Sequence, residues 1–162
     1  MNISTERLTR QHFPILQHWA GRCSGAMTLK DFPRVKEQIQ PWIERNTNVE
    51  DRMNCLIFVY ETPVGIAGLV RDNTSPKCAE LHLLLCEVGY NLIRTATYAT
   101  LCMLDRAFRD CDYQTVSVTI FTRNREYLDA RERMGFRKQT EKADMMILEV
   151  DREAFFSRKY LF

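Results

Sequence analysis

The segment from Glu87 to Leu104, EVGYNLIRTATYATLCML, has the pattern of a hydrophobic strand that turns into an amphipathic helix. The start of a helix leaves backbone N–H groups unpaired and carries about half a positive charge, so an anion such as pyrophosphate binds well there. Phosphate-binding loops at such junctions are often rich in glycine, which lets the backbone approach without a Cβ in the way. Here Arg94 and Ala96 stand where two glycines are expected.

Arg94 allows two interpretations of this loop. Its side chain either points outward and adds a cationic contact to the phosphates, or fills the space that the phosphates would occupy. If the loop needs a positive φ at this position, arginine is penalised by about 1 kcal/mol. The N–H donors survive any change of side chain, which favours a loop that still binds phosphate. A lost site stays open as the alternative.

Glu80 is the residue best suited to act as a base. It lies in the apolar run CAELHLLLCEV of residues 78–88, fourteen residues before Arg94. A carboxylate inside an apolar strand holds a proton more tightly, which suits it to take one from an ammonium group, directly or through water. The alternative is a glutamate at a strand end, hydrogen-bonded or exposed. His82 shares the same face by the period of two and is a second candidate base, or a structural histidine.

Hydrophobic periodicity predicts the elements that position these residues. Residues 78–88 are apolar on both faces, which is typical of a strand covered on both sides. The stretch 94–110 has an apolar stripe at helical spacing. The other predicted elements are a short opening strand, helical segments at 12–20 and 33–45, a hairpin of 55–61 and 64–72, strands at 115–122 and 142–150, and a helix at 124–136. This order predicts an α/β fold with a mixed central β-sheet and helices on both faces.

Composition narrows the class of protein. A chain of 162 residues without repeats or linkers is expected to form a single domain. Its net charge of +2 does not favour binding to nucleic acid or to an anionic membrane. The N-terminal residues lack an apolar signal region, and no stretch reaches the roughly 18 apolar residues of a membrane span, so a cytoplasmic location is expected. The cysteines and histidines do not have metal-ligand spacing, so no metal is expected.

Three local sequences, taken in their order, resemble the GNAT superfamily of acyl-CoA-dependent N-acetyltransferases. AELHLLLCEVGYNLIRTATYATLCML is similar to the family's strand, Q/R-x-x-G-x-G/A loop and helix, with a degenerate loop. NREYLDARERMGF resembles the N-x-x-A/S…GF ending, and PVGIAGLV resembles a hairpin strand with P-x-G. The opening TERLTRQHF…HW is closest to the ribosomal-protein and aminoglycoside acetyltransferase-like branch. The resemblance is good over residues 54–150 and implies one GNAT-like acyltransferase domain over residues 1–162.

The resemblance also implies the site residues. Glu80 takes the place of a glutamate that acts as general base in some histone-type members. Asn91 takes the Q/R position of the loop, Arg94 the first glycine and Ala96 the second. Asn124 would contact the pantetheine arm or serve as a helix N-cap, or do both. The residues expected to bind acetyl-CoA are Leu84, Leu85 and Cys86 through their backbone, and Asn91, Leu92, Ile93, Arg94, Thr95, Ala96, Thr97, Asn124 and Tyr127.

One position departs from the family's pattern near the reacting sulfur. The tyrosine that protonates the thiolate usually lies seven residues after the asparagine of the second motif, and here that position is Arg131. Tyr127 and Tyr98 lie nearby without support from a motif, so the general acid stays unassigned.

The function implied is transfer of an acetyl group from acetyl-CoA to a primary amine by direct attack in a ternary complex. The acceptor is a small-molecule amine or a peptide N-terminus, and a homodimer is possible. Two alternatives stay open. One is a binding module of the same fold that has lost catalysis and acts through a protein partner or a ligand. The other is an enzyme that uses a different, carrier-bound acyl donor.

Overall fold

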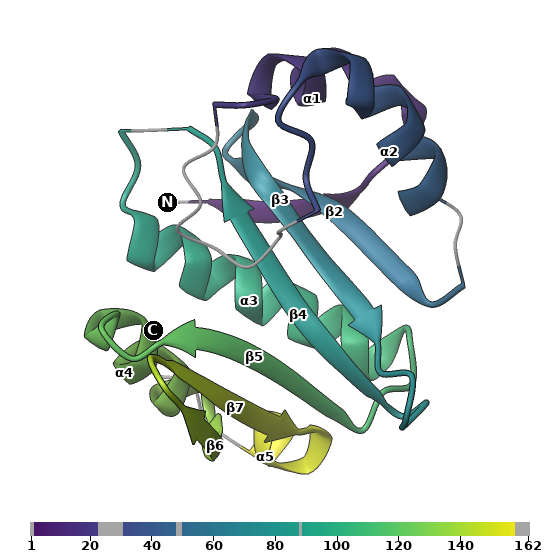
Figure 1. Cartoon of the computed structure of the whole chain (residues 1–162). Helices are drawn as coiled ribbons and strands as arrows, with labels where there is room; N and C mark the ends of the chain where they lie inside the picture. The colour runs from purple at the N-terminus through teal and green to yellow at the C-terminus, as the bar shows by residue number, and fades with distance from the viewer. Residues whose placement is uncertain (1, 23–30, 48–49, 88, 158–162) are drawn as a thin grey trace.

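The computed structural model describes residues 2–22, 31–47, 50–87 and 89–157 (Figure 1). It contains a seven-stranded sheet of order β1-β2-β3-β4-β5-β7-β6. The strands are β1 (Ile3–Arg7), β2 (Arg52–Val59), β3 (Thr62–Arg71), β4 (Cys78–Leu85), β5 (Thr115–Phe121), β6 (Arg137–Lys142) and β7 (Met145–Asp151). The α-helices are α1 (Phe13–Trp19), α2 (Ile39–Asn46), α3 (Leu92–Arg109), α4 (Arg125–Met134) and α5 (Arg152–Ser157), and short 3-10 turns at Arg10–His12 and Lys36–Gln38 precede α1 and α2. None of the described helices is long and apolar enough to cross a membrane.

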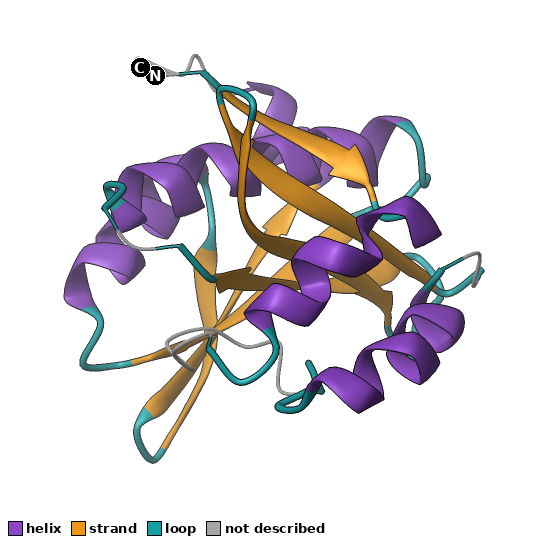
Figure 2. Cartoon of the chain, turned by 90° about the horizontal axis from the view of Figure 1, so that it is seen from above, coloured by secondary structure: helices purple, strands orange, loops and turns teal. Residues whose placement is uncertain are grey.

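The sheet is mixed because one of its strand pairs is parallel. β4 pairs in parallel with β5, and the other neighbours are antiparallel. Helix α3 makes the crossover that a parallel pair requires. Helices cover both faces of the sheet (Figure 2). The predicted mixed α/β sheet with helices on both faces is confirmed.

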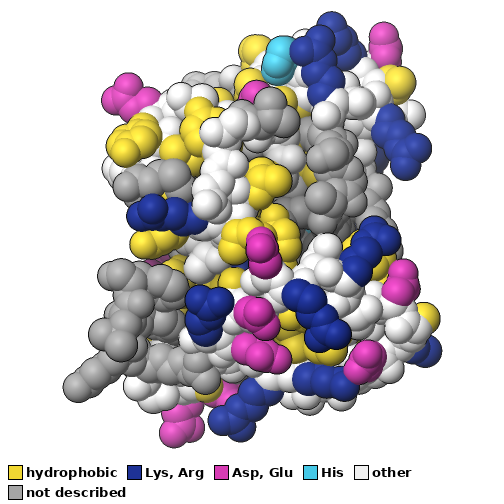
Figure 3. Space-filling view, turned by 90° about the vertical axis from the view of Figure 1, so that its left-hand side faces the viewer, with side chains coloured by type: hydrophobic (Ala, Val, Ile, Leu, Met, Phe, Trp, Pro, Cys, Tyr) yellow, Lys and Arg dark blue, Asp and Glu magenta, His cyan; other side chains and the backbone are white. Residues whose placement is uncertain are grey.

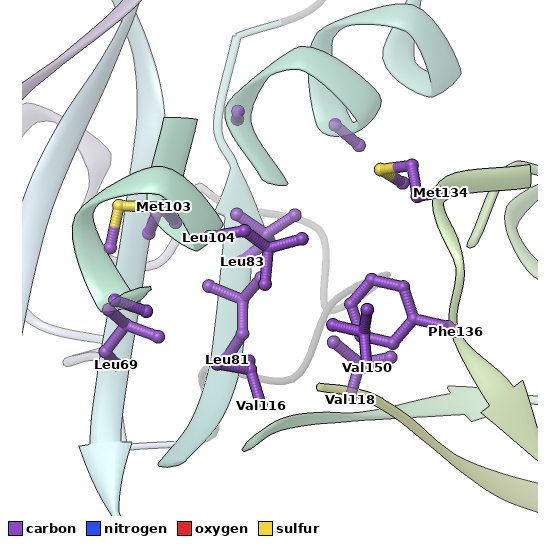
Figure 4. Close-up of a cluster of buried hydrophobic side chains, with 14 of the residues drawn as sticks. Leu69, Leu81, Leu83, Met103, Leu104, Val116, Val118, Met134, Phe136 and Val150 are labelled. Carbon is purple, nitrogen blue, oxygen red and sulfur yellow. The ribbon is translucent and has the colours of Figure 1, made fainter. Parts of the chain in front are cut away.

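Alternation along β4 divides its side chains between two hydrophobic cores. Leu83 belongs to the cluster that includes Met103 of α3 (Figure 4). Leu84 belongs to the second cluster, with Trp19 of α1 and Trp42 of α2. The strand is therefore covered on both sides, as its apolar pattern predicts, with α3 on one face and α1 and α2 on the other.

β4 and β5 separate after a short paired stretch. Residues Cys78–Glu80 pair with Thr115–Ser117, and beyond them residues 81–85 and 118–121, all within the described part of the chain, form no ladder with each other. β4 stays paired with β3, and β5 stays paired with β7. The two strands diverge toward the end at which α3 begins (Figure 1). We call the opening between residues 81–85 and 118–121 the wedge.

The C-terminal part of the chain differs from the predictions. Strand β6, with the sequence RKQTEK, is exposed at every residue, so hydrophobic alternation cannot indicate it. Helix α5 is also absent from the predicted order, and with six residues it is too short to show a clear periodicity. Element ends shift slightly as well. Strand β4 ends at Leu85 rather than at residue 88, which is outside the described residues, and α3 begins at Leu92 rather than at Arg94.

Candidate active site

Past its last pair with β5, strand β4 has backbone N–H and carbonyl groups that face the wedge. The Cys86 N–H donates to the Val64 carbonyl at 2.8 Å, on the β3 side. Successive residues of a strand direct their N–H groups to opposite neighbours, so Leu85 directs its N–H to the β5 side, where the wedge is open, and Leu84 faces β3. The predicted use of the Cys86 N–H for a ligand is therefore wrong, because β3 already accepts it. Leu85 is the one of the three predicted residues whose N–H faces the wedge.

The N-terminus of α3 keeps two backbone donors for a ligand. Asn91 is its N-cap, and the Asn91 Oδ1 accepts the Arg94 N–H at 2.9 Å. The Thr95 N–H already bonds to the Asn91 carbonyl within the first helical turn. The N–H groups of Leu92 and Ile93 have no acceptor within the helix, as is general for the first helical positions. The predicted helix start is thus present, with its third N–H donor capped by Asn91, and its binding of an anion stays a prediction.

Arg94 lies on the outside of α3. It is an exposed residue of regular helix, and its guanidinium carbon lies 5.8 Å from the centre of the Tyr98 ring, one turn later. Among the described residues the non-glycine positions with positive φ are Tyr60, Asp112 and Ala143, so the φ penalty considered for Arg94 does not arise. The left-handed conformation in the β4–α3 loop belongs to Gly89, whose φ is 92°. This geometry favours the outward orientation of the arginine.

A cavity of about 990 Å³ lies between the N-terminal half of α3 and helix α4. Figure 3 views the molecule from this side and shows apolar side chains near the middle of the face, with Lys/Arg and Asp/Glu side chains interspersed around them. The charged side chains in the cavity lining belong to Arg94, Arg133, Glu126 and Asp129. The complete lining is Asn91, Leu92, Ile93, Arg94, Thr97, Tyr98, Glu126, Tyr127, Asp129, Ala130 and Arg133.

Helix α4 contributes the residues of the second motif. Asn124 is at the N-cap position, but its side chain makes no capping hydrogen bond. Gly135 ends the helix in the left-handed conformation with φ 106°, as predicted. Tyr127 lines the cavity and is half-buried. Burial raises the pKa of the Tyr127 hydroxyl, while the nearby Arg131 guanidinium acts in the opposite direction.

Arg131 is buried on the inner face of α4. It is 3% exposed, and its neighbours along that face, Leu128 and Met134, belong to the same hydrophobic cluster as the wedge residues of β4 and β5. The Nε and Nη1 atoms of Arg131 are buried without a hydrogen-bond partner. Burial lowers the pKa of Arg131 to about 10, because desolvation penalises the charged form. Within the described part of the chain, this arginine lacks the anion that would normally accompany a buried guanidinium.

Glu80 lies at the last ladder pair before the wedge, on the face of β4 opposite α3. The Thr119 Oγ1 of β5 donates to Glu80 Oε1 at 3.3 Å, and His82 Nε2 lies 3.7 Å from Glu80 Oε2. The Glu80 side chain is 43% exposed, so the expectation of a desolvated carboxylate inside the strand is wrong. The two strands separate beside it, and this opening gives the carboxylate access to water. The arrangement brings together the two candidate bases of the sequence.

The structure separates the predicted cofactor residues into two groups. Asn91, Leu92, Ile93, Arg94, Thr97 and Tyr127 line the cavity. Thr95 and Ala96 are buried and do not line it, and the Thr97 Oγ1 donates to the Ile93 carbonyl within the helix. Sequence reasoning did not assign Tyr98, Glu126, Asp129, Ala130 and Arg133 to the site, although the helical spacing of these residues indicates one shared face on each helix.

Comparison with known proteins gives the family. The model of the acetyltransferase (GNAT) domain family matches residues 6–137, which include the wedge strands, α3 and α4. No curated protein matches the chain.

Solved structures of spermidine N-acetyltransferases share the fold. A mutant form of the spermidine/spermine N-acetyltransferase SpeG from Vibrio cholerae is 11% identical, with a TM-score of 0.78 over 98% of this chain and 100% of that chain. Spermidine N-acetyltransferase from Vibrio cholerae in complex with CoA and spermine is 10% identical, with a TM-score of 0.80 over 95% of this chain and 98% of that chain. A dodecameric structure of the Vibrio cholerae enzyme has a TM-score of 0.79 at 11% identity, over 98% of both chains.

These comparisons agree with the overall fold of the chain. The expected GNAT fold is confirmed, and the family match covers the strands and helices that build the candidate site. The family model covers more than half of the chain, so the chain belongs to the GNAT acetyltransferase family.

Proposed function

We propose that this protein transfers the acetyl group of acetyl-CoA to a primary amine of a small molecule, by direct attack of the amine in a ternary complex. The observation that carries the proposal is the wedge between β4 and β5. The cavity at α3 and α4 lies on one side of the sheet, and Glu80 faces the other side where the wedge begins. Donor and acceptor would therefore reach the wedge from opposite faces of the sheet.

The residues around the cavity fit coenzyme A. The N–H groups of Leu92 and Ile93 and the positive end of α3 suit a pyrophosphate. Arg94 and Arg133 add positive charge to the same lining. The Leu85 N–H, directed into the wedge, suits an amide of the pantetheine arm or the thioester oxygen. Side-chain identity matters little for contacts of this kind, because the donors are backbone groups.

Glu80 is the base in this mechanism. It removes one proton from the ammonium form of the acceptor, directly or through water, since its exposed carboxylate is open to both. The free amine then attacks the thioester carbonyl carbon, the C–N bond forms and the C–S bond breaks. The sulfur leaves as the thiolate and then takes up the second amine proton, which completes the free thiol. His82 and Thr119 hold the Glu80 carboxylate in place, His82 through its Nε2 at 3.7 Å and Thr119 through the hydrogen bond.

The acceptor side of the sheet favours a small cationic amine over a large protein surface. Helix α1 covers this face, and its Trp19 Nε1 donates to Glu87 Oε1 at 2.6 Å, which attaches the helix to the chain just after β4. The carboxylates of Glu80 and Glu87 attract an ammonium group. A polyamine is the first acceptor to test, because a solved structure of the same fold holds CoA and spermine. A peptide N-terminus is the second.

The test has two steps. Calorimetric titration with acetyl-CoA, and with coenzyme A in parallel, measures whether the altered loop binds the cofactor, and we expect micromolar affinity. Release of free thiol is then followed with spermidine, an aminoglycoside, an amino acid and a short peptide as acceptors. Absence of binding at millimolar cofactor contradicts the proposal. Binding without turnover on any small amine, together with turnover on the peptide, contradicts the proposed acceptor class.

A further inference from the structure

Arg131 is a buried charge for which the described protein provides no counter-ion. Its side chain is 3% exposed, and Nε and Nη1 have no hydrogen-bond partner. Among the described residues, the titratable group that interacts with it is Tyr127, on its own helix, and no carboxylate of α3, β4 or β5 does so. A buried guanidinium without a partner costs several kcal/mol in general, so such a residue usually has an anion to bind.

The place of Arg131 relates it to the ligand-binding side of the fold. Tyr127, one turn before it, lines the cavity between α3 and α4. Leu128 and Met134, on the same inner face of α4, join the hydrophobic cluster that contains Leu83 of β4 and Val118 of β5. Arg131 therefore lies on a helix that lines the cavity with one face and joins the cluster of the wedge strands with the other, one turn from the lining residue Tyr127.

We infer that Arg131 is the anion-binding residue of the wedge, and that it pairs with a negative charge carried by the acyl donor. The inference rests on the proposed function, since it assumes that the donor occupies the cavity. Two parts of an acyl-CoA can supply this charge beyond the phosphates. One is the thiolate that leaves when the C–S bond breaks, and the other is a carboxylate at the far end of a dicarboxylic acyl chain. In both cases a planar fork of N–H donors binds the anion in a site from which water is excluded.

The free protein offers a first test through its stability. In Arg131→Met an apolar side chain of similar length replaces an unpaired buried charge, and such replacements are often neutral or stabilising. We expect the melting temperature of the ligand-free Arg131→Met protein to equal or exceed that of the wild type. Arg125→Met, an exposed arginine of the same helix outside the cavity lining, is the matched control. A clear loss of stability specific to Arg131→Met would show that the arginine serves the fold, and would overturn the inference.

The second test measures the charge of the ligand directly. Ultraviolet absorbance of the thiolate, followed against pH, gives the pKa of the coenzyme A thiol when it is bound to the protein. We expect the wild type and Arg125→Met to lower this thiol pKa by roughly one unit, as neighbouring cations do for cysteine, and Arg131→Met to abolish the shift. Calorimetry with acetyl-CoA and succinyl-CoA forms the other arm. If the wild type binds succinyl-CoA more tightly than acetyl-CoA, and Arg131→Met loses this preference, the anion that pairs with Arg131 is the acyl-chain carboxylate and not the thiolate.

The outcomes separate the inference from the proposed function. If the wild type does not bind coenzyme A at all, both fall. If the wild type binds it, and Arg131→Met changes neither the thiol pKa nor the preference between the two donors, only the role of Arg131 is overturned. Arg131→Lys keeps the charge without the planar fork, and we expect it to restore part of the thiol shift but not the discrimination between donors.

Discussion

The Thr119 Oγ1 of β5 lies 3.3 Å from the Glu80 Oε1 of β4, just beyond the last ladder pair of the two strands, Glu80 and Ser117. This hydrogen bond is a side-chain link across the point at which the sheet opens. It orients the carboxylate toward the wedge, and His82 holds the second oxygen at 3.7 Å. The candidate base is thus positioned from both strands of the opening.

Replacement of Glu80 by Gln should lower the turnover number at neutral pH by about a hundredfold or more, the range that a general base contributes. The amide keeps the shape of the side chain and still accepts a hydrogen bond from Thr119, but it cannot take a proton. The affinity for acetyl-CoA should not change, because Glu80 is outside the cavity lining. Steady-state kinetics and calorimetry on the same preparation measure both quantities.

Thr119→Val is the companion variant, since it keeps the base and removes only its hydrogen bond. We expect a loss of less than about tenfold, which is the size of one ordinary hydrogen bond. Turnover that is unchanged in Glu80→Gln would show that another group, with His82 first in line, removes the proton.

Trp19→Phe should destabilise the protein by about 1.5–3 kcal/mol more than Trp42→Phe, because a hydrogen bond to a carboxylate has that value. Both indoles are 1% exposed and both belong to the cluster under α1 and α2, so the loss of volume is matched. Trp19 Nε1 donates to Glu87, whereas Trp42 Nε1 is buried and has no hydrogen-bond partner among the described residues. Urea unfolding followed by circular dichroism gives the difference. Equal effects of the two substitutions would mean that the Trp19–Glu87 bond contributes nothing to stability.

Much of the fold follows from local patterns, because burial leaves a clear period in the sequence. The run at residues 78–85 and the alternation at 115–121 identify the two strands of the wedge, and Gly135 marks the end of α4. Strand β6 leaves no such period, since all its side chains face solvent and only its pairing with β7 makes it a strand.

The site is less predictable than the fold for a similar reason. Arg131 falls at helical spacing between Leu128 and Met134, which indicates the buried face of α4, yet an arginine is almost never buried without a partner. Because buried arginines are rare, the sequence alone predicts an exposed side chain for Arg131. For Glu80 the sequence left both a desolvated and an exposed carboxylate open, and the structure agrees with the exposed one. The choice depends on where two strands stop pairing, and no local pattern encodes that point.

Arg94→Ala should weaken acetyl-CoA binding about two- to fivefold, the effect of losing one exposed ionic contact. The guanidinium lies over Tyr98 on the outside of α3, where it adds charge without filling the helix N-terminus. The weakening should shrink as salt is raised, because the contact is exposed and screened. Arg125→Ala, an exposed arginine outside the cavity lining, is the control in the same titrations. A gain of affinity in Arg94→Ala would instead show that the arginine obstructs the phosphates.

Gly65→Ala should impair both folding and acetyl-CoA binding, since a Cβ at this position would lie 2.3 Å from the Leu84 carbonyl oxygen. That oxygen is backbone, so β3 and β4 must move apart beside the N–H that Leu85 directs into the wedge. We expect a destabilisation of about 1–3 kcal/mol, as for overpacked cores, and weaker cofactor binding. Gly89→Ala tests backbone strain without a steric clash. Apart from its chain neighbours, no described atom lies within 4 Å of the added Cβ, although φ is 92°. Its cost of about 1–2 kcal/mol comes from backbone conformation alone.

Asp112→Asn should make the free energy of unfolding depend less on pH in the acidic range. Hydrogen bonding and charge from Lys77, with a smaller contribution from Arg152, lower the pKa of the Asp112 carboxyl below its ordinary value of 3.8. A carboxyl with a lowered pKa stabilises the fold fully above its unfolded value, and this stability is lost as the pH falls through the folded value. Asparagine tolerates the positive φ of 56° at this position, so the variant tests charge rather than backbone strain.

The pair Lys77–Asp112 connects the loop before β4 to the loop before β5, at the end where the two strands are still paired. Urea unfolding at several pH values between 6 and 3 gives the free energy of unfolding as a function of pH. The slope of this free energy against pH should therefore be smaller for Asp112→Asn than for the wild type. Asp72→Asn is the control, since the pKa of Asp72 is lowered by hydrogen bonds from Thr74 within its own turn and not by a cation. If raising the salt concentration reduces the slope of the wild type and of Asp72→Asn but not that of Asp112→Asn, the stabilisation comes from the ion pair, because salt screens exposed charges. An identical slope in Asp112→Asn and the wild type would show that this ion pair does not stabilise the end at which β4 and β5 are paired.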